Sequence, residues 1–120
     1  MAPRSPLSIA TQSVERLVKE EASYHREMEQ QEERIKRLNA EPVAEDDDGN
    51  REYFIKQEKQ ALEETKKIFP SLKQKINEAL AKLEKLLAEE GQKGEASNVE
   101  EIDAAKNAVA KAKAAVRESS

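Results

Sequence analysis

The stretch that decides the fold is residues 55–86, IKQEKQALEETKKIFPSLKQKINEALAKLEKL. Mostly apolar side chains recur along it in alternating steps of three and four residues, without a slip. This spacing is typical of a coiled-coil seam on one long α-helix. The inward positions are Ile55, Glu58, Leu62, Thr65, Phe69, Leu72, Ile76, Ala79, Leu83 and Leu86. Further apolar residues widen the stripe, so we expect this helix to contact two neighbours. They are Ala61, Ile68, Leu80 and Leu87.

Pro70 lies inside this stripe. A proline in a helix interior removes one hydrogen bond and costs about 3 kcal/mol, and it often ends the helix. Here the seam keeps its phase from Phe69 to Leu72 and Ile76. We therefore predict one long helix kinked at Pro70, with a break into two helices as the alternative.

Two further amphipathic segments flank the long helix. The seam of the first has the polar residues Glu21 and Gln31 at inward positions, which predicts that this part of the bundle is wet or open. Its positions are Val14, Leu17, Glu21, Tyr24, Met28, Gln31, Ile35 and Leu38. The stripe of the third consists mainly of small residues, which allow close approach but bury little area. It comprises Val99, Ile102, Ala105, Val109, Ala112 and Val116.

Turn residues and caps set the expected boundaries. Residues 1–7 are predicted to be a disordered tail, because Pro3 and Pro6 oppose helix formation. The expected helices span about 9–39, 51–89 and 98–117 within a single domain, 8–118. The expected N-caps are Ser8 or Thr11, then Asp48 or Asn50, and finally Ser97 with Glu100 as a capping box. An acidic loop over 40–50 and a loop containing Gly91 and Gly94 connect the helices. The predicted fold is all-α, an antiparallel, coiled-coil-like three-helix bundle.

Composition excludes several classes of protein. Charged residues make up 38% of the 120 residues, aromatic residues 3%, and there is no Cys or Trp. Without Cys the chain has no disulfide or thiolate metal site, which is compatible with the cytoplasm. The net charge is −4 with both signs interleaved, so no basic face for nucleic acid is expected. We expect no signal peptide and no membrane span, because no apolar run is long enough.

The sequence supplies no catalytic constellation. His25 lies one turn from Glu21 and from Glu29, but it is the only histidine, so we interpret it as a surface residue with ion-pair neighbours. The acidic loop fails as a calcium site, because Ala44 and Ile55 would occupy the first and twelfth ligand positions. We predict no enzyme activity, no metal site, no cofactor and no small-molecule substrate.

Several motifs together resemble the tubulin-binding cofactor A family, also called tubulin-specific chaperones A. They are ERLVKE at 15–20, Tyr24, QQEERI at 30–35 and IFP at 68–70. The resemblance covers about residues 14–87. It implies a three-helix bundle that captures β-tubulin for assembly of the αβ heterodimer, without hydrolysing nucleotide, in the cytoplasm and in association with the cytoskeleton.

A charged helical bundle with little pocket volume would bind a folded partner along its helix faces. The residues expected to contact β-tubulin are Arg16, Lys19, Glu20, Tyr24, Gln31, Glu32, Ile68 and Phe69. The alternative for Tyr24, Ile68 and Phe69 is a place in the core. The thin core also makes a homodimer possible. The alternative function is a self-associating coiled-coil scaffold, which would need seams that continue into long uninterrupted heptads.

Overall fold

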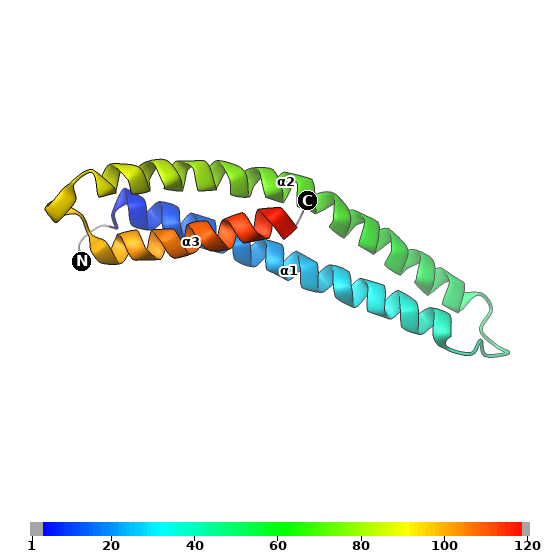
Figure 1. Cartoon of the computed structure of the whole chain (residues 1–120). Helices are drawn as coiled ribbons and strands as arrows, with labels where there is room; N and C mark the ends of the chain where they lie inside the picture. Colours follow the sequence, from blue (N-terminus) through cyan, green and yellow to red (C-terminus); the bar gives the residue numbers. More distant parts are fainter. Residues whose placement is uncertain (1–3, 119–120) are drawn as a thin grey trace. The chain divides into compact units, whose positions relative to one another are not determined.

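A computed structural model describes residues 4–118 and contains α1 (Pro6–Ala40), α2 (Asn50–Gly91), the short 3₁₀ helix η1 (Gly94–Ala96) and α3 (Val99–Glu118) (Figure 1). No strand occurs in this described range. The predicted all-α three-helix architecture is confirmed. α2 continues through Pro70 as one helix rather than breaking into two. Within residues 4–118, no helix is both long and apolar enough to cross a membrane.

The chain divides into two compact units. The three-helix unit combines the start of α1, up to Glu21, with the part of α2 from Pro70 onwards and with α3. The hairpin unit is Ala22–Phe69, which holds the rest of α1, the connecting loop and the first part of α2. In each unit, α1 and α2 run antiparallel (Figure 1). That the whole chain behaves as a single domain stays a prediction.

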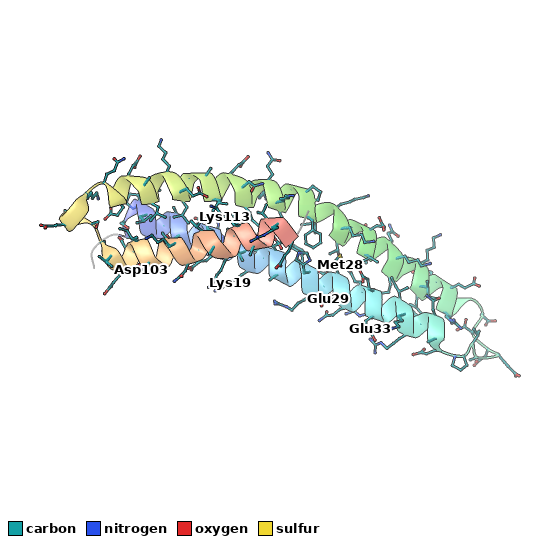
Figure 2. All side chains as sticks on the ribbon, viewed as in Figure 1. Lys19, Met28, Glu29, Glu33, Asp103 and Lys113 are labelled. Carbon is teal, nitrogen blue, oxygen red and sulfur yellow. The ribbon has the colours of Figure 1, made fainter. Side chains whose placement is uncertain are left out.

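The apolar core lies in the three-helix unit. All three helices contribute side chains that are at most 9% exposed: Leu7, Ala10 and Val14 from α1, Leu72, Ile76, Leu80 and Leu83 from α2, and Ala105, Ala108 and Ala112 from α3. The alanines let the α3 backbone approach its neighbours closely. Lys113 projects from α3 towards α2 (Figure 2), and its Nζ lies 3.6 Å from Glu84 Oε1. The predicted inward position of Val99 is wrong, because this first residue of α3 is 65% exposed.

α1 begins earlier than predicted. Ser5 caps it, because Ser8 N donates to Ser5 Oγ at 3.0 Å. Pro6 then occupies the first helical position, where a missing N–H costs nothing. Thr11 is not a cap, since its Oγ1 donates to Leu7 O at 2.9 Å within the helix. The predicted tail is therefore helical from Pro6, and residues 1–3 lie outside the described residues.

The start of α2 depends on Asp47 rather than on the predicted Asp48 or Asn50. Asp48 and Gly49 have φ angles of 50° and 81°, and this left-handed turn brings Asp47 back to the helix start. Arg51 N donates to Asp47 Oδ2 at 3.1 Å. The Arg51 guanidinium also donates to the carbonyls of Asn39 and Glu41, at 2.6 and 2.7 Å, and so satisfies the end of α1.

The start of α3 is capped by Asn98, one residue later than the predicted box. Asn98 Oδ1 accepts from Glu101 N at 3.1 Å, and the Glu101 carboxylate accepts from Ser5 Oγ. The connection is held by Glu90, whose Oε1 accepts from Asn98 N at 2.9 Å and whose Oε2 lies 2.7 Å from Lys93 Nζ. The contact with Lys93, followed by the hydrogen bond from Asn98 N, holds the pKa of Glu90 below its ordinary value. The contact with Glu90 in turn raises the pKa of Lys93.

Candidate protein-binding surface

The hairpin unit has a polar rather than an apolar interior. Its two most buried residues are Gln31 and Thr65, which are 5% and 4% exposed, and every described apolar side chain of this unit keeps some exposure. Thr65 Oγ1 donates to Ala61 O at 3.0 Å, within its own helix. Gln31 Oε1 is buried and accepts no hydrogen bond from any described residue. The predicted inward place of Gln31 is confirmed, and so is that of Glu21 in the three-helix unit, which is 4% exposed.

An open groove lies at the loop end of the hairpin unit, between α1 and α2. It has a volume of about 400 Å³. Leu38 and Phe54 supply apolar surface, and Phe54 is 53% exposed. Arg34 and Glu58 form an ion pair between the helices, with Nη1 and Oε1 3.6 Å apart. The lining residues are Arg34, Arg37, Leu38, Glu41, Phe54, Gln57 and Glu58.

All four aromatic residues of the chain lie in the hairpin unit. Phe69 stacks on His25, with ring centroids 4.5 Å apart. His25 is half-buried, and its interpretation as a surface residue with ion-pair neighbours stays a prediction. The rings of Tyr53 and Phe54 contact each other edge to face, with their centroids 5.7 Å apart, and both residues are more than half exposed. No group of three or more metal-binding side chains occurs among residues 4–118.

The eight predicted contact residues are divided between the two units. Arg16, Lys19 and Glu20 are exposed on α1 in the three-helix unit, where Lys19 also lines a groove of about 180 Å³ with residues of α1 and α3. The other five belong to the hairpin unit. Glu32 is exposed there, Gln31 is buried, and Tyr24, Ile68 and Phe69 are half-buried.

The outer side of α1 in the hairpin is strongly charged. Figure 2 shows Met28 on the side of α1 towards α2, with Glu29 and Glu33 on its outer side, where both are exposed. Sequence reasoning did not identify the groove between the helices, with its residues Arg37, Leu38 and Phe54, as a candidate surface. A signal for it exists, because Phe54, Ala61 and Ile68 recur every seven residues beside the seam.

Comparison with known proteins identifies the family. The sequence profile named tubulin binding cofactor A matches residues 2–109, which is most of the chain and includes the whole hairpin unit. The chain belongs to the tubulin binding cofactor A family. The resemblance seen in residues 14–87 is therefore confirmed, and the match extends into α3.

Curated members of the tubulin binding cofactor A family are similar to this chain over most of their length. The tubulin-specific chaperones A of rabbit and human are each 34% identical over 95 residues, covering 79% of this chain and 82% of each relative. The yeast protein of the same name is 33% identical over 87 residues, covering 72% and 76%. No solved structure matches the chain significantly.

Proposed function

We propose that this protein is a tubulin-folding chaperone that captures β-tubulin folding intermediates and holds them for assembly of the αβ heterodimer. Membership of the tubulin binding cofactor A family carries this proposal. The curated relatives named above are all called tubulin-specific chaperones A. We further propose that the protein works in the cytoplasm, in association with the cytoskeleton, and that it does so as a binding protein rather than as an enzyme.

The surface chemistry supports capture of a protein. The grooves described above are open to solvent and are flanked by charged side chains on helices, which suits contact with a large partner better than enclosure of a small molecule. Seven of the eight predicted contact residues keep some exposure and remain our candidates in this arrangement. The eighth, Gln31, is 5% exposed, so it reaches β-tubulin only if the hairpin opens.

A pull-down that offers α- and β-tubulin separately tests the proposal. We expect the full chain to retain β-tubulin and to leave most α-tubulin unbound. Reversing the charges of Arg16 and Lys19 should weaken retention if these exposed side chains contact the client. A chain that is fully helical by circular dichroism but retains no β-tubulin would overturn the proposed function.

The self-associating scaffold is the other function that the sequence leaves open. It requires seams that continue into long uninterrupted heptads, whereas the seams of α1 and α2 stop at the turn-rich connections after Ala40 and Gly91. Light scattering on the same sample measures self-association. A dimer that also retains β-tubulin still fits the chaperone, while large oligomers that bind no tubulin would favour the scaffold.

A further inference from the structure

The hairpin unit carries an apolar strip outside its seam. Phe54, Ala61 and Ile68 lie at seven-residue intervals on α2, so they share one edge of the helix, two turns apart. Phe54 is 53% exposed, and the other two are half-buried. The hairpin unit contains parts of only two helices, so it has no third helix of its own to cover this strip.

The open groove at the loop end begins where the strip begins. Phe54 belongs to both, and Leu38 supplies apolar surface from α1. Arg34 already forms an ion pair with Glu58, with Nη1 and Oε1 3.6 Å apart. Arg37 is exposed and forms no ion pair with any residue in the described range 4–118. The groove therefore combines an exposed aromatic ring with a cation that is available to a partner.

We propose that an amphipathic helical segment of the β-tubulin client docks on this strip and groove. One of its apolar side chains lies between Leu38 and Phe54, and one of its carboxylates pairs with Arg37. This inference rests on the proposed function and specifies its binding surface. In helix-in-groove recognition the docking helix presents apolar anchors at positions i, i+3, i+4 and i+7, and the seven-residue spacing of the strip matches the interval from i to i+7. Aromatic and arginine side chains are the residue types that most often dominate the energy of protein interfaces.

A second copy of the chain suits the groove less well than the client does. In a two-fold dimer the same patch faces itself. The groove lining contains two arginines and two glutamates, so a second copy brings no surplus of negative charge to Arg37. A client carboxylate neutralises this arginine without placing another arginine beside it.

Paired substitutions test the surface. Phe54→Ser and Arg37→Glu should each weaken the affinity for β-tubulin about tenfold or more, as expected at an interface hot spot. The controls are Ile9→Ser, at a residue that is 50% exposed in the three-helix unit, and Arg26→Glu, at an exposed position on α1 outside the groove. Both controls should stay within about twofold of the native affinity, as surface changes outside an interface do. Circular dichroism and light scattering should give the native helicity and mass for all four variants.

Photo-crosslinking identifies the occupant. A photoreactive amino acid at Gln57, which lines the groove, should crosslink to a helix of β-tubulin, whereas one at Glu29 should not. Crosslinks from Gln57 to a second copy, or to a β-tubulin strand, would overturn the inference. If the native chain binds β-tubulin and the variants Phe54→Ser and Arg37→Glu bind it equally well, the proposed docking surface is wrong. The proposed capture of β-tubulin is then unaffected. If the native chain binds no β-tubulin, the proposed function fails and the inference fails with it.

Discussion

The same two helices build two units of very different character. In the three-helix unit, ten apolar residues are buried, and Val14, Ile76 and Leu83 are completely inaccessible. In the hairpin unit, the deeply buried residues are Gln31 and Thr65, and the apolar side chains stay partly exposed. Each unit contains an ion pair between helices at 3.6 Å, so the presence of such a pair does not account for the difference. The third helix accounts for the difference, because α3 supplies the additional apolar surface that the hairpin unit lacks.

This difference indicates that the two units have different roles, one in stability and the other in recognition. Burial of apolar surface is the main stabilising contribution in folding, so the three-helix unit should hold most of the stability. Partly exposed apolar and aromatic side chains are available to a partner, so the hairpin unit is better suited to recognition. Variants in each unit test this assignment.

The largest effect should come from truncating the core of the three-helix unit. Ile76→Ala removes a completely buried side chain and should lower the free energy of unfolding by about 2–5 kcal/mol. Ile55→Ala makes the same chemical change at a half-buried site of the hairpin and should cost about 1 kcal/mol. Urea unfolding followed by circular dichroism measures both. Equal losses would contradict the division between the units.

The next effect should be a gain of stability in the hairpin. Gln31→Leu replaces a buried amide whose Oε1 accepts no hydrogen bond from the described residues. Removing such a polar group should raise the free energy of unfolding by about 1–2 kcal/mol. Amide hydrogen exchange should slow in residues 22–69 more than in residues 72–86. A loss of stability would show that the amide has a partner, such as an ordered water.

A smaller effect is expected where α1 and α3 begin in the three-helix unit. Ser5→Ala removes both the N-cap of α1 and the hydrogen bond to Glu101. Loss of an N-cap typically costs about 1 kcal/mol. Ser8→Ala is the matched control, because Ser8 contributes its backbone N–H to the cap and not its side chain. Thermal unfolding of the two variants compares them directly, and equal melting temperatures would exclude Ser5 as the cap.

The smallest effect should be a dependence on pH at the connection between α2 and α3. The folded state lowers the pKa of Glu90, so this contribution to stability is present above the ordinary pKa of glutamate. It is lost as the pH falls through the lowered value. The pKa of Lys93 is raised, so its contribution is present below the ordinary pKa of lysine and is lost as the pH rises through the raised value.

Comparing unfolding of the native chain and Glu90→Gln across acidic pH tests this prediction. The native chain should lose more stability on acidification than the variant does, because the variant has no charge at this position to lose. Parallel pH profiles would show that the contacts of Glu90 with Lys93 and Asn98 contribute nothing to stability.

The sequence predicted the inward positions of the helices well, and it predicted their ends poorly. All seam residues from Ile55 to Leu86 are at least partly buried, because the three-and-four spacing depends only on helix geometry. Each predicted N-cap lies at least one residue from the observed cap, since each helix start offers several competing polar residues. Asp47 displaced Asp48 because the backbone of Asp48 turns left-handed, which is a property of the folded loop.

The proposed binding surface was harder to predict for a different physical reason. Periodicity identifies the side chains that face inward, but it does not say which remaining faces a third helix covers. Phe54 stands one residue before the seam position Ile55, and only the structure shows that it stays exposed beside Leu38. The family resemblance led to residues such as Arg16 and Tyr24, which the structure divides between the two units.

The placement of the aromatic residues gives the molecule a built-in optical probe. The chain has no tryptophan, and both of its tyrosines, Tyr24 and Tyr53, lie in the hairpin unit. Intrinsic fluorescence therefore monitors that unit alone, while the far-ultraviolet signal averages over all the helices. A hairpin that loosens before the rest of the chain would separate the two unfolding curves of the unlabelled native protein.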